Sequence, residues 1–335
     1  MKHVSILVPE SAVMEAVADP RYAFNAANQF LVAAGKLPLF QVHLVGNTTE
    51  VCLHDGAFTV HADKIWKEIN RTDLIIIPAL FGDMKSAIDK NKSFIPWIKK
   101  QHEQGAEVAS LCVGAFLLAS TGLLNGKSCS THWAFYNEFR TMFPEVIVKD
   151  GSIITEENRI YSSGGANSYW NLLLHLVEKY TDRDTAILAA KYFAIDIDRE
   201  SQSAFAMFRG QKSHTDDAIK KAQEFIEANY QEKLTLDQLA SMVATSRRSF
   251  ERRFKQATSN TVTEYMQRVK IEAAKRSFES TRKNINEVMY DVGYTDTKAF
   301  RSVFKKITGL TPIDYRNKYN KGVSSGRKQS SEIFE

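Results

Sequence analysis

One cysteine of the chain occupies a position at which proteins can place a reactive nucleophile. The segment V-A-S-L-C-V-G-A-F-L-L-A-S-T-G-L-L, from Val108 to Leu124, predicts a strand that ends at Cys112 and a helix that begins at once. Gly114 would permit a close turn there. A thiol near a helix N-terminus has its pKa lowered by the helix dipole and the free N–H groups. The arrangement is that of a nucleophile elbow in which cysteine replaces serine.

Two further residues could complete a reactive set around this thiol. His132, in the segment T-H-W, could act as a neighbouring base, and Glu15, near the N-terminus, could supply a carboxylate. A cysteine with a base in hydrogen-bond reach would be a nucleophile for acyl transfer or hydration. Simpler interpretations stay open, because Cys112 could be a small buried apolar residue, His132 could pack or cap, and Glu15 could be solvated. Thiolate character would also favour oxidation, so a redox switch is a third interpretation.

The elements that must position these residues alternate between strand and helix over about the first 200 residues. Strands are expected at 4–8, 39–45, 73–78 and 107–111, and helices at 22–34 and 95–104. This alternation predicts an α/β fold, a parallel sheet with helices on both faces. The three cysteines, Cys52, Cys112 and Cys129, have no C-x-x-C spacing, which indicates neither a disulfide framework nor a cysteine zinc site. We expect no cofactor and no bound metal.

An internal repeat organises the last third of the chain. The segments 234–255 and 285–305 match at an offset of 49 in their first halves and 50 in their second halves. Repeats indicate duplicated structural units, and two copies indicate a duplicated module rather than a solenoid. Each copy has apolar residues at i, i+3, i+4 and i+7, then a turn, then a second helix. The sequence therefore predicts an all-α domain with two helix-turn-helix units.

The second helix of each copy should place two phenylalanines inward and polar residues outward. Cationic and hydroxyl side chains of this kind bind phosphate and base edges in DNA, although a solvated basic face is the simpler interpretation. From Thr215 onward the chain has 23 Lys and Arg against 16 Asp and Glu, which favours nucleic acid as the partner of this part. The candidate DNA-facing residues are Arg247, Arg248, Glu251, Arg252, Lys255, Thr297, Lys298, Arg301, Ser302 and Lys305.

The block from about 217 to 319 resembles the double helix-turn-helix domain of AraC/XylS-type transcription regulators. The resemblance is carried by L-D-Q-L-A, S-R-R-S-F-E-R-R-F-K, D-V-G-Y-T-D-T-K-A-F-R-S-V-F-K-K and G-L-T-P-I-D-Y-R. It implies two recognition helices in successive major-groove segments, joined by a long helix that would run here from about 263 to 279. Carried over by position, the base-facing residues would be Arg248, Glu251, Arg252, Thr297, Lys298, Arg301 and Ser302.

The first half resembles the ThiJ/PfpI superfamily, which is class I glutamine amidotransferase-like, and more closely the sensor half of GlxA-type AraC regulators. The segments that carry this resemblance are S-L-C-V-G-A-F-L-L-A-S-T-G-L-L-N-G-K, S-T-H-W and I-Y-S-S-G-G-A-N-S-Y-W. It implies a flavodoxin-like sandwich, with Glu15, Cys112 and His132 in the places of the superfamily's reactive site. In regulators of this type the pocket binds an effector, often a small nitrogenous metabolite. The expected pocket residues are Glu15, Cys112, Val113, His132 and Gly165.

These observations predict a sequence-specific DNA-binding regulator, which we expect to be an activator and a homodimer. The expected parts are a sensing domain at 1–200, a linker at 201–216, a DNA-binding domain at 217–320 and a disordered tail at 321–335. Ligand sensing is favoured over catalysis, because a sensor that destroys its ligand cannot report a steady concentration. The alternatives are a cysteine hydrolase or amidase-like enzyme tethered to DNA and a Cys112 redox sensor.

The expected partners are an operator duplex, the effector and RNA polymerase, with no membrane. The N-terminal apolar run is too short for a signal peptide, and no stretch approaches about 18 consecutive apolar residues. We therefore expect a cytoplasmic protein at the nucleoid.

Overall fold

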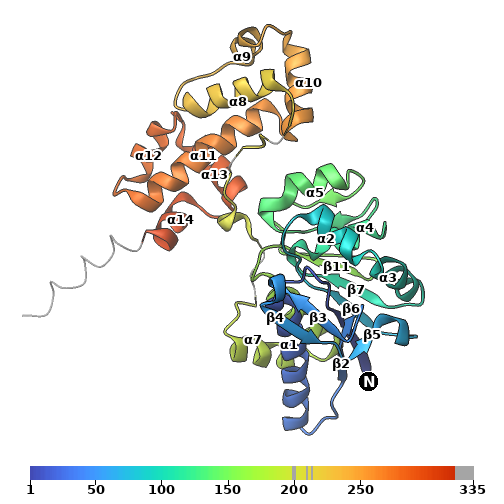
Figure 1. Cartoon of the computed structure of the whole chain (residues 1–335). Helices are drawn as coiled ribbons and strands as arrows, with labels where there is room; N and C mark the ends of the chain where they lie inside the picture. The colour runs from blue at the N-terminus through green and yellow to red at the C-terminus, as the bar shows by residue number, and fades with distance from the viewer. Residues whose placement is uncertain (198–200, 209, 213, 321–335) are drawn as a thin grey trace, which may run out of the picture. The chain divides into compact units, whose positions relative to one another are not determined.

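The computed structural model (Figure 1) describes residues 1–197, 201–208, 210–212 and 214–320. The chain divides into two compact units, one ending at Gln202 and the other beginning at Ser203. The tail expected at 321–335 lies outside the described residues.

A seven-stranded sheet forms the centre of the first unit, in the order β10-β11-β7-β6-β1-β2-β5. Neighbouring strands are parallel, except that β10 and β11 are antiparallel. The predicted parallel sheet is confirmed, and the antiparallel edge strand is an addition to it. The strands are β1 (Lys2–Leu7), β2 (Phe40–Gly46), β5 (Lys64–Ile65), β6 (Leu74–Ile77), β7 (Glu107–Ser110), β10 (Ile154–Glu157) and β11 (Ile160–Ser163). Two small sheets pair β3 (Glu50–Leu53) with β4 (Phe58–His61) and β8 (Ser128–Cys129) with β9 (Ile147–Val148).

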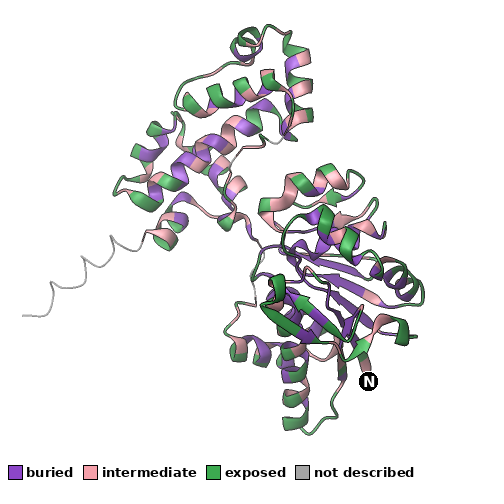
Figure 2. Ribbon diagram, viewed as in Figure 1, coloured by how far each residue is buried: buried purple, intermediate pink, exposed green. Residues whose placement is uncertain are grey.

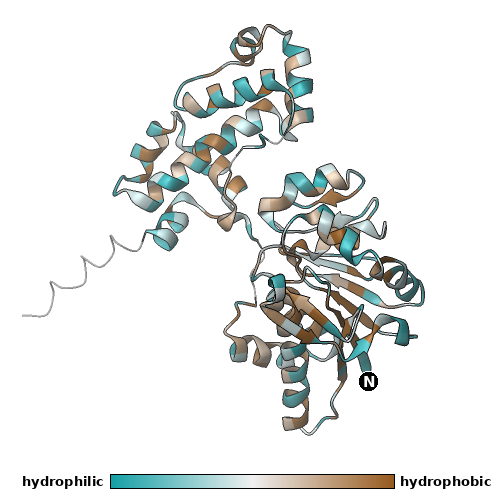
Figure 3. Cartoon of the chain, in the orientation of Figure 1, coloured by the Kyte–Doolittle hydropathy of each residue, from teal (hydrophilic) through white to brown (hydrophobic). Residues whose placement is uncertain are grey.

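Continuous apolar strands place the core of this unit along the sheet. β6 reads L-I-I-I, and its four side chains are at most 1% exposed. Strands covered on both faces lose the alternation of half-exposed strands and become continuously apolar. Figures 2 and 3 show this as a buried, hydrophobic set of central strands.

Helices cover both faces of the sheet, which confirms the flavodoxin-like sandwich. On one face α1 (Met14–Ala33), α6 (Tyr169–Tyr180) and α7 (Arg183–Phe193) pack against one another, and α1 lies on β1 and β2. The other layer contains α2 (Met84–Asn91), α3 (Phe94–Glu103) and α4 (Ala115–Ser120), which packs on β6. A short α5 (Tyr136–Met142) follows a single 3₁₀ turn.

Helix α1 begins earlier than the sequence pattern predicted. The expected helix spanned 22–34, whereas α1 starts at Met14 and continues through Pro20, which is buried inside it. Proline has no backbone N–H and disfavours helix interiors, so the pattern indicated a break at this position. As a result Glu15 lies in the first turn of α1.

In the described part of the second unit, seven α-helices pack around two small cores. The first core combines residues of α8, α9, α10 and the first half of α11, and the second combines the rest of α11 with α12, α13 and α14. The long helix α11 is therefore shared, and the predicted bridge at about 263–279 is confirmed. The helices are α8 (Asp217–Ala228), α9 (Leu236–Met242), α10 (Arg247–Thr258), α11 (Val262–Ser280), α12 (Ile285–Asp291), α13 (Thr297–Thr308) and α14 (Pro312–Tyr319).

The repeat is also visible in the local geometry of the two copies. Thr235 and Ser246 cap α9 and α10 through their side chains, as the sequence predicted. The turn of the second copy contains Gly293 at φ 73°, and the matching position of the first copy is Ala244 at φ 50°. Both turns therefore use the left-handed conformation, which glycine adopts most easily.

Part of the segment expected to be a linker, 201–216, is packed among the described residues. Gln202 is 1% exposed and belongs to the first unit. Ala204 is buried, Phe208 packs on the first helical core, and α8 begins at Asp217. Apolar side chains therefore pack part of this polar segment on the second unit.

Among the described residues, no helix is long and apolar enough to cross a bilayer.

Candidate functional site

The candidate sensor residues come from the carboxyl ends of neighbouring parallel strands. The chain runs from β1 to β2 on one side and then returns to β6 on the other, so the strand order reverses between β1 and β6. Open α/β sheets bind ligands at the carboxyl edge beside such a reversal. Glu15 follows β1, Cys112 follows β7 and Gly165 follows β11. The topology therefore brings these three positions to one edge.

The turn after β7 holds Cys112 in a strained backbone conformation. Its φ is 53°, in the left-handed region that residues with a Cβ rarely adopt. The Cys112 N–H donates to Ser163 Oγ at 3.3 Å, and Thr131 Oγ1 donates to the Cys112 carbonyl at 3.1 Å. A Cβ at Gly114 would lie 2.4 Å from the Pro78 carbonyl oxygen, so this position requires glycine for close approach. The geometry agrees with the predicted elbow.

The thiol of Cys112 does not have the lowered pKa that the sequence predicted. Its side chain is 5% exposed, and burial raises its pKa to about 12, against a smaller lowering by a hydrogen bond from the Val113 N–H. Burial disfavours the thiolate because the charged form loses its hydration. The following helix, α4, has six residues and starts only after a 3₁₀ turn, so its dipole is small. Val113 is likewise buried.

His132 and Glu15 occupy different environments at this edge. His132 is half-buried, its Nδ1 accepts from the Ala134 N–H at 3.1 Å, and burial lowers its pKa. With Nδ1 as acceptor, the neutral ring carries its proton on Nε2. Glu15 is exposed. Within the described part of the chain, no hydrogen bond or ion pair joins either residue to Cys112.

Two aromatic residues at the start of α6 bind a carboxylate in the first half of α1. Tyr169 and Trp170 are both buried, and both donate to the Asp19 Oδ2, at 2.7 and 3.0 Å. The pKa of Tyr169 is raised by burial, by its bond to Asp19, and by the charges of Asp19, Glu15 and Cys112. Tyr169 therefore lies within electrostatic reach of both Glu15 and Cys112. Asp19 follows Glu15 by one helical turn, which was the available sequence signal.

The glycine pair after β11 is tightly enclosed. A Cβ on Gly164 would lie 1.9 Å from Gln202 Nε2, and Gly165 has φ 75° with Ser168 Oγ beside it. Larger residues would displace Gln202 or strain the turn. The side of Gly165 that faces Gln202 is thus filled by protein atoms.

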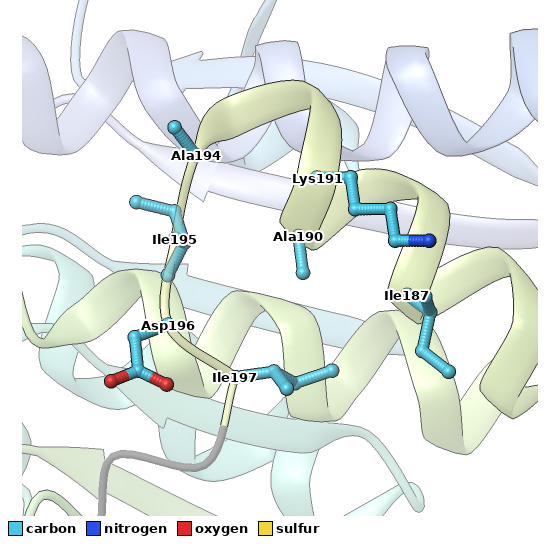
Figure 4. A pocket seen from close by; sticks show the side chains of 7 residues that line it. All are labelled: Ile187, Ala190, Lys191, Ala194, Ile195, Asp196 and Ile197. Carbon is cyan, nitrogen blue, oxygen red and sulfur yellow. The ribbon is translucent and has the colours of Figure 1, made fainter. Parts of the chain in front are cut away.

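A separate pocket of about 400 Å³ lies at the C-terminal end of α7. Figure 4 shows its lining side chains, which are Ile187, Ala190, Lys191, Ala194, Ile195, Asp196 and Ile197. None of the five expected pocket residues contributes to it. Within the described ranges, no group of three or more His, Cys, Asp or Glu is placed to hold a metal ion.

In the second unit, the ten candidate DNA-facing residues fall on equivalent positions of two equal helices. α10 and α13 each span 12 residues and begin 50 positions apart. Phe250 and Phe254 on one, and Phe300 and Phe304 on the other, are fully buried. The matched outward pairs are Arg247 with Thr297, Arg248 with Lys298, Glu251 with Arg301, Arg252 with Ser302, and Lys255 with Lys305. Nine of these residues are exposed and Thr297 is half-buried.

The arginines of α10 differ in whether they form ion pairs with carboxylates of the same chain. Arg247 lies 3.8 Å from carboxylate oxygens of both Asp237 and Glu251. Arg253 makes two short bonds to Asp216, at 2.6 and 2.9 Å, and its guanidinium holds the pKa of that carboxyl below the usual range. Arg253 therefore fixes α10 to the start of α8. Arg248 and Arg252 make no such ion pair among the described residues.

Two family models match the chain. A model of the DJ-1/PfpI family matches residues 4–179, and a model described as a helix-turn-helix domain matches residues 239–318. The first covers more than half of the chain, and the second covers the paired helical units. Together they correspond to the two units of the structure.

Two relatives that align with most of the chain are transcription regulators. The chain is 26% identical over 245 residues to the HTH-type transcriptional regulator GbdR of Pseudomonas aeruginosa, covering 73% of this chain and 66% of that protein. It is 21% identical over 314 residues to the regulator CdhR of the same species, covering 93% and 90%. A crystal structure of a putative transcriptional regulator from Vibrio parahaemolyticus matches 57% of this chain and 98% of its own, at TM-score 0.51 and 24% identity.

Proposed function

Since the chain belongs to the DJ-1/PfpI family, carries an AraC-type helix-turn-helix domain and is a DNA-binding transcription regulator, we propose that a small effector bound beside Cys112 controls it. The regulator would be an activator that contacts RNA polymerase, would work as a homodimer, and would act in the cytoplasm at the nucleoid. We assign it to regulators rather than enzymes, because the relatives that align with both units are named as regulators.

The observation that supports the DNA interface is the equivalence of α10 and α13. Two capped helices of equal length bury their aromatic faces and leave matched cationic and hydroxyl side chains in solvent. Unpaired Arg and Lys side chains can bind phosphate, and an arginine can bind the O6 and N7 of guanine together. The proposed base-reading residues are Arg248, Glu251, Arg252, Thr297, Lys298, Arg301 and Ser302, with Arg247, Lys255 and Lys305 as phosphate contacts.

The effector proposal rests on the carboxyl edge of the sheet. The strand order reverses there, the exposed Glu15 could accept a cationic nitrogen, and Tyr169 lies within electrostatic reach of Glu15. The pocket would use Glu15, Cys112, Val113, His132 and Gly165. A buried thiol with a raised pKa favours a binding role for Cys112 over a nucleophilic or redox role.

The DNA proposal is tested by selecting duplexes from a random pool on the full chain and then changing Arg252 to Ala. Loss of a base contact should weaken the selected duplex by about 1–3 kcal/mol and relax preference at one base pair. Lys100→Ala, which removes one exposed charge from α3, is the control and should change neither quantity. A uniform loss across all sequences would instead make Arg252 a phosphate contact.

The effector proposal is tested by a thermal-shift screen of small nitrogenous metabolites on the full chain. A bound compound should raise the melting temperature, because ligand binding to the native state stabilises it. Glu15→Gln should remove the shift, whereas Cys112→Ser should retain metabolite-dependent DNA binding. A Cys112→Ser chain that no longer responds would favour the enzyme or redox alternatives.

A further inference from the structure

Gln202, the last residue of the first unit, is buried, and its side chain forms hydrogen bonds with residues around the candidate sensor site. It is 1% exposed, and its Nε2 lies within hydrogen-bond distance of the Thr131 carbonyl at 2.9 Å, Tyr136 Oη at 2.9 Å and the Ser152 carbonyl at 3.1 Å. Its Oε1 accepts from the Trp133 N–H at 3.3 Å. The amide thus bonds the residues on both sides of His132.

The same side chain fills the space above the glycine pair of the site. The Nε2 atom would lie 1.9 Å from a Cβ on Gly164, and the Oε1 atom 3.5 Å from one on Gly165. A buried amide that loses its partners is costly, so Gln202 is sensitive to movement of these loops. The hydrogen bonds of Gln202 therefore depend on the positions of the segments that carry His132 and Gly165.

An ion pair on α11, between the buried Lys275 and the half-buried Glu272, binds the backbone of residues 206 and 208. Lys275 is 3% exposed, and its Nζ donates to the Ala206 carbonyl at 2.6 Å and to Glu272 Oε2 at 2.8 Å. The same Glu272 oxygen accepts from the Phe208 N–H at 3.1 Å. The loss of water around Lys275 must be offset by further hydrogen bonds, and the backbone at 206 and 208 supplies them.

Two more contacts fix this segment to the second unit. The Tyr319 hydroxyl donates to the Ala204 carbonyl at 3.3 Å, and the Phe208 ring lies 5.1 Å from that of Tyr265, centroid to centroid. A single residue, Ser203, separates Gln202 from Ala204. One residue spans at most about 3.6 Å, so this junction has almost no slack.

We propose that residues 202–208, here called the strap, transmit the state of the sensor site to the bridging helix α11. This inference rests on the proposed function. An effector that moves the loops at 131–133 or 164–165 would change the bonds of Gln202. Through the strap, the change would reach Glu272 and Lys275 on the helix shared by both helix-turn-helix cores. The effector acts only by binding the two arrangements with different affinity.

The test uses the reciprocity of coupled sites and needs no identified effector. If the sensor site influences DNA binding, DNA must influence the sensor site by the same coupling free energy. The probe is a duplex selected on the full chain from a random pool. Hydrogen–deuterium exchange of backbone amides at 129–136 is measured with and without this duplex. We expect the duplex to change the exchange rate there by at least about threefold in the unmodified chain.

Two variants should abolish that change while leaving DNA affinity within about twofold. Inserting Gly-Ser-Gly-Ser between Gln202 and Ser203 adds slack and leaves every anchoring side chain intact. Glu272→Gln keeps the size of the side chain but removes the charge that holds Lys275. Because the insertion alters no packed residue, it tests the inference even where Glu272→Gln folds poorly.

Two controls match these changes. The same four residues inserted after Gly35 lengthen an exposed turn of the first unit. Gln101→Leu removes another glutamine that is 1% exposed and bonds the Thr72 N–H and the Asn70 carbonyl, far along the chain from the strap. Both controls should retain the DNA-induced change at 129–136.

The outcomes separate the two proposals. A chain that enriches no duplex overturns the proposed function, and the strap with it. If the chain binds a selected duplex but exchange at 129–136 stays the same, the strap alone is overturned. The strap is also overturned if the insertion at 202 behaves like the insertion after Gly35.

Discussion

At the scale of single residues, the three cysteines differ in their access to solvent. Cys52 is exposed, whereas Cys112 and Cys129 are buried and have pKa values raised to about 12. The identity and place of Cys112 were readable from the sequence, because a strand and an apolar helix flank it. Its protonation state was not readable, since the residues packed around it, such as Thr131 and Ser163, meet it only in the folded chain.

We predict that the Cys112 thiol stays protonated at neutral pH. At pH 8, alkylation of Cys112 by iodoacetamide should be at least about 10³-fold slower than that of Cys52, since each unit of pKa reduces the thiolate population about tenfold. Peptide mass spectrometry over a time course measures both rates in the same sample. Equal rates would show that the thiol is exposed and ionised.

The same burial gives a pH dependence of stability. The pKa of Cys112 is raised in the folded state, so the buried thiol contributes fully to the free energy of unfolding below a pH of about 9, the ordinary pKa. This contribution is lost as pH rises towards about 12. The free energy of unfolding by urea should therefore fall over this window, and it should fall less in Cys112→Ala. Cys129 contributes with the same sign, so the double variant should show the flattest profile.

At the scale of elements, the two helix-turn-helix copies use the same left-handed turn with different residues. Ala244 has φ 50° and Gly293 has φ 73°. A Cβ at Gly293 would also lie 2.1 Å from the Gln231 carbonyl oxygen. Equivalent positions of the repeat therefore have different tolerance for a side chain.

Reciprocal substitutions at these turns should have opposite effects. Gly293→Ala should lower the free energy of unfolding by about 1–3 kcal/mol, through strain and the close contact. Ala244→Gly should leave it unchanged or raise it by up to about 1 kcal/mol, as backbone strain is relieved. Urea unfolding followed by helical circular dichroism measures both. Similar destabilisation by the two changes would contradict the assigned turn geometry.

The elements that the sequence predicted are those with a regular repeat of apolar residues or a continuous apolar run. The paired helices and the bridge α11 follow from a repeat with regular apolar spacing, and β6 follows from L-I-I-I. The edge strand β10 reads I-T-E-E and gave no signal, because an edge strand can remain polar. The role of Gln202 was also not predictable, since its partners at 131–136 and 152 lie far from it in the sequence.

At the scale of the whole molecule, the formal net charge of +5 is unevenly distributed. The excess of Lys and Arg lies in the helical part, where α10 and α13 expose them. Each phosphate contact releases condensed counterions from DNA, so charge of this kind makes binding depend on salt.

We predict that affinity for a selected duplex falls by about 10³-fold or more between 50 and 200 mM salt, as expected for about six phosphate contacts, three from each chain of the proposed homodimer. Lys255→Ala and Lys305→Ala should each reduce the slope of log affinity against log salt by about 1. Fluorescence anisotropy titrations at several salt concentrations measure the slope. Lys99→Ala, on α3, is the matched control and should leave the slope unchanged.

Helix α11 contributes residues to both helical cores. This limits which changes of sequence the second unit can accept during evolution. One residue added within α11 would rotate everything downstream by about 100° and advance it by about 1.5 Å. On the proposed function, helix α11 therefore fixes the distance and the relative rotation of the two DNA-reading helices. Point substitutions on α10 and α13 can change which bases are read. Across target promoters, the number of base pairs between the segments read by α10 and α13 should stay constant while the base sequences of these segments change.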